Sequence, residues 1–594
     1  MNLSESHAQI QNEKPQIAKN ILEIKENKSQ TIDEDLSKPD KKASDTLSNS
    51  YSNATYRVGI QTAQTLPLSL NEAIRKALEN SNDIEVARDD VRFQETQLRS
   101  LIGAYDPVLG IQPIFSRSSS TGSTASNDFR LNTGFDKLLE RGGGRINSFF
   151  NTSQTGRNSQ NNQTFNQTAG LGTTSSTTYF SNLGVNYTQP LFRNFRIDST
   201  RRQIKIQRKR LQQSDADFRR QTIEIISQVQ RSYWDLVFAL RDQQNRLANL
   251  NLARENLRQI EARISAGSAA PLARAEVSTE LANRESDVLL ATQQVSITEN
   301  TLKTLLLREP NAPEWSQSFV PVDKPVFSDE PVNLEDAVKD AIDNRPELSR
   351  LRLQSEINKI DIDFFKNQTK PRIDLVSSVS LNGISLGNQN TDSSAIPQFS
   401  GNNEILRQNL NALLNQAGLS QIPNPQVPVQ GLPDYFNGGT FRSIQNLFRS
   451  DAPNYSIGIT FEIPLGNRTA KANLAGAKIQ QQQTDAQMRS QEQTVITEVR
   501  NAVQAVETSR QRVLTARRAR ENAEIQLEGE RKLFEVGRST TFLLFQRENS
   551  LTNSRNAEIR AETDYNKALS DLQRAASTTF RLNNVEVDSP IENK

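Results

Sequence analysis

One stretch of the chain changes its pattern of apolar positions from that of a strand to that of a long helix. Between Asn454 and Leu465 every second residue is apolar and the others are polar or small, which predicts a strand with two unlike faces. After Pro464 and Gly466, about 70 residues without proline run to Gly537, as in one helix roughly 105 Å long. Along it, apolar or small residues recur in alternating steps of four and three, the spacing of a helix that packs along one seam. The seam is Val495, Val499, Ala502, Val506, Ser509, Val513 and Ala516.

The same succession of strand, proline and long helix occurs earlier in the chain. Residues 181–191 alternate as a second strand, and a helix from about 196 to Gly267 follows with the same spacing of apolar residues. Two further strands with one apolar face are predicted, one after each of two other prolines. Proline ends regular structure, so we expect these residues to turn the chain. The expected strand-to-helix turns are Pro190, Pro464, Pro107 and Pro371.

Matching residues in the two halves of the chain indicate an internal duplication. Leu70 and Leu334 lie 264 positions apart, and so do Pro107 and Pro371. Each half is expected to run helix, strand, long loop, strand, long helix, helix. The expected organisation is a disordered polar leader at 1–66, a first repeat at 67–309, a proline-rich linker at 310–332, a second repeat at 333–580 and a polar tail at 581–594.

Strands with one apolar and one polar face suit a transmembrane barrel with lipid outside and water inside. The pattern predicts about four such strands per chain, whereas about eight are needed to close a barrel. Several copies must therefore share one barrel, and each adds its helices to a cylinder continuous with it. Two points are left open by the pattern: whether residues 127–153 add two strands per copy, and whether the 383–453 loop covers the outer mouth.

Composition narrows the classes of function. The net charge of +2 gives no general attraction to nucleic acid, and no nucleic-acid partner is expected. A hydrophobic fraction of 35% is low for a compact protein of 594 residues but suits a coiled coil or a barrel with a polar lumen. The chain has no cysteine and one histidine, which excludes disulfides, zinc clusters and histidine-based triads. No enzyme, cofactor or metal site is expected.

The start of the chain supports an alternative to a channel, namely a coiled-coil scaffold. Met1-Asn-Leu-Ser-Glu lacks the basic and apolar regions of a signal peptide, and no window of about 18 apolar residues predicts a membrane-spanning helix. The missing signal favours a non-channel coiled-coil scaffold of the cell envelope or cytoplasm. The alternating strands beside prolines favour a channel, because a scaffold needs no lipid-facing strands.

Five short segments stand in a fixed order beside the strands and along the long helices. They are Tyr-Thr-Gln-Pro-Leu-Phe (187–192), Arg-Ser-Tyr-Trp-Asp-Leu (231–236), Ala-Arg-Ile-Ser-Ala-Gly (262–267), Phe-Glu-Ile-Pro-Leu-Gly (461–466) and Lys-Leu-Phe-Glu-Val-Gly (532–537). With the duplication, this set resembles the TolC-type outer membrane efflux protein family over roughly residues 66–582.

The resemblance implies an α+β membrane protein: a homotrimer whose 12-stranded β-barrel is continuous with a long α-helical coiled-coil periplasmic tunnel. It implies an outer-membrane channel of a tripartite efflux or type I secretion system, a passive conduit from periplasm to exterior. The partners it implies are outer-membrane lipid, a periplasmic adaptor (membrane fusion) protein and an inner-membrane pump. It does not indicate the cargo or the kind of pump.

Two glycines at the ends of the long helices are the first candidate functional residues. Gly267 and Gly537 are expected to cap these helices in the left-handed conformation. The resemblance adds that these turns are periplasmic tips that meet the adaptor, with Val536 and Arg538 beside the second glycine.

The residues just past the second tip are candidates for a tunnel gate. Similar proteins often place aspartates there, but the matching positions are Leu543 and Gln546, so an acidic ring is not implied. Leu543 and Leu544 from several chains would instead close the tunnel by packing and dewetting. The alternative is that they are ordinary coiled-coil core. Glu276 is the nearest acid in the first half.

Basic residues crowd the start of the first long helix. Two interpretations stand, a solvated helix face or contact with anionic lipid headgroups. Nearby, Tyr233 and Trp234 are expected to pack between helices, and Gly142–Gly144 is expected to form a tight turn. The basic residues are Arg193, Arg196, Arg201, Arg202, Lys205, Arg208, Lys209 and Arg210.

Overall fold

The computed structural model describes residues 60–119, 125–156, 177–268, 270–387, 394–399, 401–429, 433–449 and 453–591, with the single residues 57, 121 and 451. The chain divides into two compact units. The smaller unit contains Arg246–Ser296, and the larger contains Ala63–Asn245 and Ile297–Lys594. Most of the leader expected at 1–66 lies outside the described residues, and a strand already begins at Gln61.

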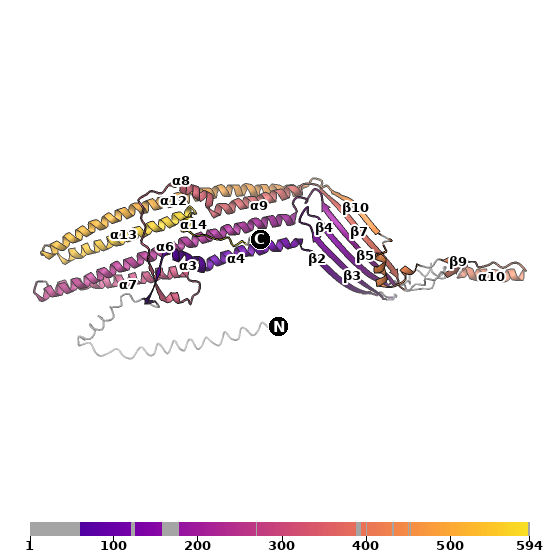
Figure 1. The fold of residues 1–594 in the computed structure, drawn as a ribbon, viewed down its shortest axis with the longest axis horizontal. Coiled ribbons are helices and arrows are strands. Elements are labelled where there is room, and N and C mark those ends of the chain that lie inside the picture. The colour runs from indigo at the N-terminus through magenta and orange to yellow at the C-terminus, as the bar shows by residue number, and fades with distance from the viewer. Residues whose placement is uncertain are drawn as a thin grey trace, which may run out of the picture. The chain divides into compact units, whose positions relative to one another are not determined.

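Each half contains short helices, strands of one large sheet and a pair of long helices (Figure 1). The first half has β1 (Gln61–Leu68), α3 (Leu70–Asn80), α4 (Asn82–Ile102), η2 (Gly103–Tyr105), β2 (Val108–Ser118), β3 (Ser126–Leu138), β4 (Arg145–Gly156), β5 (Thr177–Pro190), α6 (Ser199–Ser265) and α7 (Leu272–Leu306). The linker has η3 (Pro313–Ser316) and β6 (Gln317–Pro321). The second half has α8 (Leu334–Asn344), α9 (Pro346–Gln368), β7 (Arg372–Leu386), β8 (Ser394–Pro397), α10 (Asn402–Gln416), β9 (Gln426–Val429), η4 (Asp434–Phe436), α11 (Thr440–Leu447), β10 (Pro453–Glu462), α12 (Arg468–Glu535), α13 (Thr541–Ala575) and α14 (Thr579–Leu582).

The duplication is visible in the backbone at the helix breaks. The helices predicted at 68–104 and 334–368 are each interrupted once, at Ser81 and at Arg345, where ψ is 122°. Arg345 precedes a proline, and that position disfavours helical backbone. Ser81 stands 264 positions before Arg345 and takes the same conformation. The two halves therefore share local geometry where their side chains differ.

The large sheet is antiparallel in the order β10-β7-β5-β4-β3-β2. The four strands predicted from alternation are β2, β5, β7 and β10. Residues 127–153, left open by their pattern, form the hairpin β3–β4 and complete six strands, two more than the predicted four. Within the described residues, β10 and β2 are the edges of this sheet.

The segments expected as linker and loop contain regular structure. In the linker at 310–332, β6 pairs with β1. The expected polar loop at 383–453 holds a small hairpin, β8–β9, together with α10 and α11. Helix α11 lies against β7, β5 and β4 of the large sheet.

The predicted seams are buried. On α12, Val495, Val499 and Val513 have no exposed surface. Ala341 of α8 and Leu348 of α9 pack in one cluster with Val495 and Val499. On α6, Val229, Tyr233 and Leu236 are likewise fully buried in the larger unit. The cores are therefore narrow lines between helices, as the steps of four and three predict.

Candidate functional site

One face of the large sheet carries apolar side chains on all six strands, interrupted on β3 and β4 by Thr133, Ser148 and Thr152. Directly paired residues of antiparallel strands point to the same face, so the register identifies each row of side chains. One row across all six strands is Leu109, Phe135, Ser148, Val185, Val379 and Tyr455. The edge strands expose such residues most: Tyr455 is 81% and Leu109 is 63% exposed. A soluble protein rarely leaves so broad an apolar surface open to water.

The opposite face of the sheet is mainly polar. The adjacent row on that face is Val108, Asp136, Asn147, Asn186, Ser378 and Ser456. Its side chains bond to one another: Arg145 lies 3.0 Å from Asp136, Asn147 donates to Asp136 at 3.0 Å, and the Ser378 and Ser456 hydroxyls are 2.8 Å apart. The sheet therefore offers one side to lipid and the other to water.

The four prolines lie where the chain passes between sheet and helices. Pro190 is the last residue of β5, and Pro464 follows β10. Asn194 and Asn467, at φ 68° and 45°, complete the turns into α6 and α12. The other two stand at the reverse passage, from helix to strand: Pro107 precedes β2 and Pro371 precedes β7. Only two of the four are therefore strand-to-helix turns.

The basic cluster is divided between internal ion pairs and exposed charge. Arg202 lies 2.6 Å from Asp361 and stacks over Phe364, and Lys209 lies 2.7 Å from Glu356. These residues fasten α6 to α9 and are not available to lipid. The exposed members are Arg196, Lys205, Arg208 and Arg210. The Gly142–Gly144 turn lies nearby, and Gln189 donates to the Gly142 carbonyl at 2.9 Å.

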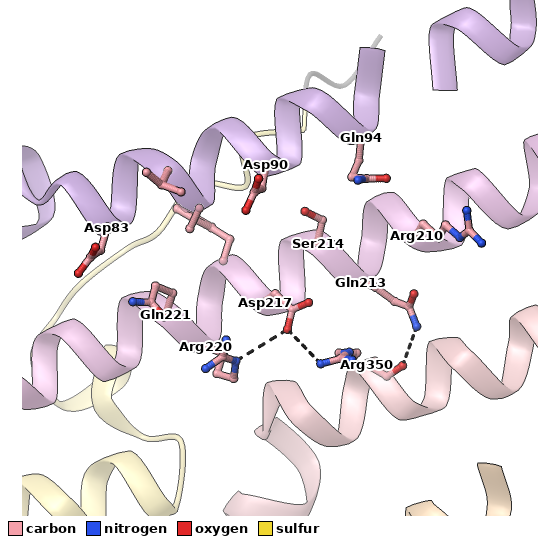
Figure 2. Close-up of a pocket in the computed structure, with 13 residues that line it drawn as sticks. Asp83, Asp90, Gln94, Arg210, Gln213, Ser214, Asp217, Arg220, Gln221 and Arg350 are labelled. Carbon is pink, nitrogen blue, oxygen red and sulfur yellow. Dashed lines mark hydrogen bonds and ion pairs between the residues drawn. The ribbon is translucent and has the colours of Figure 1, made fainter. Parts of the chain in front are cut away.

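A groove of about 690 Å³ lies between α4 and α6, with Arg350 of α9 at its edge. Figure 2 shows Asp217 pointing toward Arg220 and Arg350, each 3.8 Å away. Asp83 and Asp90 line the α4 side. Its charges are mixed in sign and its lining is polar, so it lacks the apolar character of a small-molecule pocket.

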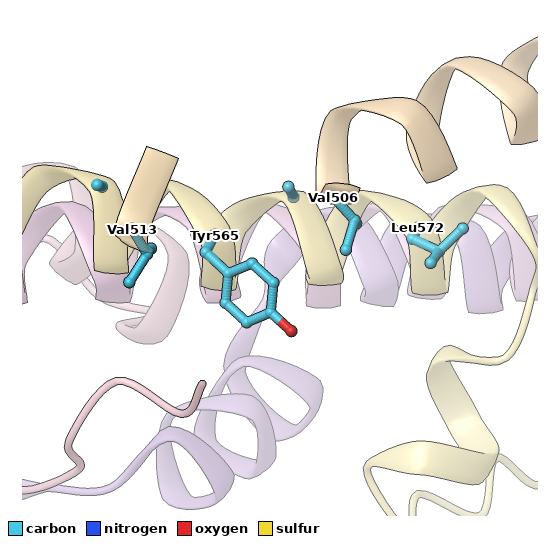
Figure 3. Packing of buried hydrophobic residues seen from close by; sticks show 6 residues of the cluster. Val506, Val513, Tyr565 and Leu572 are labelled. Carbon is cyan, nitrogen blue, oxygen red and sulfur yellow. The ribbon is translucent and has the colours of Figure 1, made fainter. Parts of the chain in front are cut away.

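Helices α12 and α13 form a hairpin with its own core. Figure 3 shows Val506 and Val513 of α12 against Tyr565 and Leu572 of α13. Ion pairs flank this core, with Arg520 2.6 Å from Glu558. Burial raises the pKa of the Glu558 carboxyl, and the attraction of Arg520 opposes that rise. The hairpin is thus held by packing on its inner side and by charge along its edges.

Hydrogen bonds at the tip of this hairpin define a glycine cap. Gly537 has φ 77°, its N–H donates to the Phe534 carbonyl at 3.1 Å, and the Arg538 N–H donates to the Leu533 carbonyl at 2.9 Å. This pair of bonds is the Schellman motif, in which left-handed backbone satisfies the last helical carbonyls. Val536, at 69% exposure, lies at the surface of the tip, as does Arg538.

Three residues of the expected gate separate into two groups. Leu544 is 6% exposed and packs with Ala523, Leu527 and Leu551 inside the hairpin, so it cannot line a tunnel. Its neighbour Leu543 is 38% exposed. Gln546, one turn further on, is also exposed and lies on the same helix face as Leu543. Including Leu544 in the gate was therefore wrong, because its side chain fills the core between α12 and α13.

The tip of the smaller unit repeats the same cap. Gly267 has φ 72°, its N–H donates to the Ile264 carbonyl at 2.9 Å, and the Ser268 N–H donates to the Arg263 carbonyl at 2.8 Å. Glu276 is exposed in the first turns of α7. Because this tip belongs to the other unit, it is not positioned against Leu543.

A buried ion pair in the larger unit was missed by the sequence patterns. Lys303 and Glu299 have no exposed side-chain surface and lie 3.0 Å apart. Lys303 also donates to the carbonyls of Trp315 and Gln317, at 2.9 and 2.6 Å, and Glu299 accepts from the Phe319 N–H at 2.9 Å. The pair thus fixes β6. Its one signal in the sequence is an acid and a base four positions apart on a helix, which is common on exposed faces.

Tyr233 fastens the same region. Its hydroxyl donates to the Asp323 carboxylate at 2.7 Å and lies 3.1 Å from the Leu68 carbonyl oxygen, and burial raises its pKa. Tyr233 and Trp234 are both buried, so the expected helix-packing role is confirmed. Among the described residues, no group of three or more His, Cys, Asp or Glu side chains could hold a metal ion. No helix in this part of the chain has the length and apolar character needed to cross a membrane.

Comparison with known proteins identifies the family. The model of the outer membrane efflux protein family matches residues 150–306 and 337–578, about two thirds of the chain. Comparison with curated proteins gives no match. The fold is similar to that of CusC, at 16% identity and a TM-score of 0.56, covering 85% of this chain and 91% of that one. It is similar to that of the CmeC outer membrane channel of Campylobacter jejuni, at 14% identity and a TM-score of 0.55, covering 87% and 90%.

A third similar fold is the outer membrane protein VceC of Vibrio cholerae, at 15% identity and a TM-score of 0.54, covering 85% of this chain and 95% of that one. These structural likenesses extend over nearly the whole chain. The family model covers parts of both repeats, including the strand-to-helix turns and both helical tips. The chain belongs to the outer membrane efflux protein family.

Proposed function

We propose that the protein is the passive outer-membrane conduit of an export system, with three copies closing one barrel. Membership of the efflux family makes it an outer membrane channel, with its helices extending into the periplasm. The single observation that carries the proposal is the two-faced sheet with edges at β2 and β10. In lipid, unpaired edges leave backbone groups unsatisfied, so the sheet must close. Six strands are too few to close alone, and six from each of three copies make eighteen, enough to leave an aqueous lumen.

Apolar side chains exposed on the helices support an assembly of copies. Val86 and Phe93, seven positions apart on α4, are 62% and 58% exposed. Ile479 and Ile525 on α12 are 55% and 69% exposed. A helix of another copy would cover such residues in a shared tunnel. The two structural repeats, 67–309 and 333–580, would each supply helices to that tunnel.

The tips are the proposed docking surface for a periplasmic adaptor, through which an inner-membrane pump drives export. At the second tip Leu533, Val536 and Phe542 are 43%, 69% and 71% exposed around Gly537. Nothing lies within 4 Å of a Cβ placed on Gly537, so a bulky side chain there would extend outward. Gly537→Trp, Val536→Asp and Phe542→Asp should reduce crosslinking to the adaptor. Unchanged crosslinking in all three would contradict this docking site.

The proposed gate consists of Leu543 and Gln546 from each copy, near the second tip. Their exposure on one helix face fits a ring that closes by packing and dewetting rather than by charge. We assign no catalytic step to the protein.

Purification from fractionated membranes tests the conduit against the scaffold. A conduit should appear in the outer-membrane fraction as an oligomer that migrates faster or slower on gels depending on heating, and should form pores in planar bilayers. A water-soluble single chain without sheet structure in detergent would contradict the proposal and favour the scaffold.

A further inference from the structure

Helix α11 has a seat of small residues on the apolar face of the sheet. The Ser443 hydroxyl lies 2.7 Å from that of Ser181, which lies 3.0 Å from that of Thr152. Ser181 pairs with Gly383 on the neighbouring strand. A Cβ on Gly383 would overlap the backbone carbonyl of Ser443, so only glycine allows the helix to lie this close. Ser443 and Leu447 are buried in this contact.

The seat lies just beyond the apolar rows of the sheet. On β7 these rows run from Ile373, paired with Phe461, to Leu381, paired with Pro453. That span of nine residues equals the length of a tilted strand that crosses the hydrocarbon core. Gly383 follows one row later, at the end of β7 away from α9. In the proposed orientation this end is the outer one, so α11 lies at the level of the outer headgroups.

The side of α11 that faces away from the sheet exposes aromatic residues. Phe441 and Phe448 are 73% and 69% exposed. Phe448 is the C-cap of α11 and stands seven positions after Phe441, about two helical turns on, so both lie on one side of the helix. Two arginines accompany them: Arg442, and Arg449, whose guanidinium lies 3.7 Å from the Tyr435 ring centroid. Aromatic residues with nearby arginines are typical of segments that lie in a membrane interface.

The position of α11 in the sheet decides what covers this aromatic side. A second copy joins the sheet at the edges β2 and β10, whereas α11 lies over the inner strands β7, β5 and β4. The apolar rows directly beside it face lipid in the proposed barrel. The occupant that fits both facts is lipid of the outer leaflet.

We propose that α11 is an interfacial anchor that inserts Phe441 and Phe448 at the boundary between headgroups and acyl chains and so fixes the depth of the barrel. This inference rests on the proposed function. The chain has no cysteine, so single-cysteine variants of the full chain place one fluorophore at a chosen residue. The variants are Phe441→Cys, Phe448→Cys, Ile457→Cys and Ser456→Cys, each reconstituted in phosphatidylcholine vesicles.

Quenching by nitroxide lipids, labelled near the headgroup or at the acyl-chain centre, and by aqueous iodide reports depth. Labels at 441 and 448 should be quenched most by the headgroup nitroxide, the label at 457 by the acyl-chain nitroxide and the label at 456 by iodide. If 441 and 448 respond to iodide as 456 does, and to neither lipid, the anchor is refuted. If 457 also fails to respond to lipid, the barrel itself is refuted.

Two glycine substitutions test whether α11 is held by close contact at Gly383 or would tolerate a change at any glycine of the sheet. Gly383→Ala, combined with the label at 448, should displace α11 and lower quenching by the headgroup nitroxide at least about two-fold. Gly458→Ala is the matched control, because nothing lies within 4 Å of a Cβ placed there. If Gly383→Ala and Gly458→Ala gave equal quenching of the label at 448 by the headgroup nitroxide, the seat at Gly383 would be contradicted. A label at 457 that is still quenched by the acyl-chain nitroxide would show that the barrel is intact and that only the seat fails.

Discussion

Replacing Lys303 with methionine tests what holds the segment between the two repeats in place. The ammonium of Lys303 contacts the Glu299 carboxylate and two backbone carbonyls, and no side-chain surface of either residue reaches water. Lys303→Met keeps much of the aliphatic volume but leaves Glu299 as a buried charge without its partner. The strand that depends on this pair is β6, whose Phe319 N–H donates to Glu299.

The size of the effect follows from the burial. Removing one partner of a buried ion pair costs about 3–5 kcal/mol, because the remaining charge cannot be solvated. Local opening of β6 would bring Glu299 into water and relieve that cost. At tenfold per 1.4 kcal/mol, the open state becomes more populated by at least about 100-fold.

Hydrogen exchange at the Phe319 amide measures this opening directly. Exchange should accelerate by at least about 100-fold in Lys303→Met. Lys339→Met, at an exposed position on α8, is the matched control and should leave the amide unchanged. Lys303→Met combined with Glu299→Gln should recover part of the protection, because no buried charge remains. A Phe319 amide that exchanges equally in Lys303→Met and the control would refute the reasoning.

Three further predictions concern the α12–α13 hairpin. Leu543→Ser should raise leak conductance in planar bilayers with little change in stability. Leu544→Ser, at the buried neighbour, should instead lower the free energy of unfolding by at least about 2 kcal/mol. If the two variants changed conductance equally and stability equally, their assignment to gate and core would be contradicted. Gly537→Ala should lower the free energy of unfolding by about 1–2 kcal/mol, read from denaturant midpoints, because alanine is strained at φ 77°; an unchanged midpoint would contradict this. A hydrogen bond from Arg555 lowers the pKa of the Glu524 carboxyl, so the stability it contributes is present above pH 4.5 and is lost as pH falls through the lowered value. The difference in melting temperature between wild type and Arg555→Gln should therefore shrink in acid, and a difference independent of pH would contradict the pairing.

The parts of the fold that follow from short-range periodicity were predictable from the sequence. The seam of α12 and the cap at Gly537 depend on residues within a few turns of one another, and the structure confirms both. The hairpin β3–β4 has a weaker pattern, because Thr133, Ser148 and Thr152 interrupt the apolar face of its strands. Only pairing with β2 on one side and β5 on the other identifies these residues as strands.

Other features depend on contacts that no local pattern records. Helix α11 has eight residues, too few for a periodic signal, and its position requires Gly383 on β7. Leu543 and Leu544 are identical in sequence character, and only the neighbouring helix distinguishes the exposed one from the buried one. The ion pair of Lys303 reads in the sequence as one more surface pair.

The hairpin β3–β4 widens the barrel without adding a helix to the tunnel. The diameter of a barrel grows roughly in proportion to its number of strands, so six strands per copy in place of four give a mouth about 1.5 times as wide. The helical tunnel gains no helix from that hairpin. In the proposed assembly the two extra strands per copy therefore enlarge the outer vestibule and leave the helical tunnel unchanged.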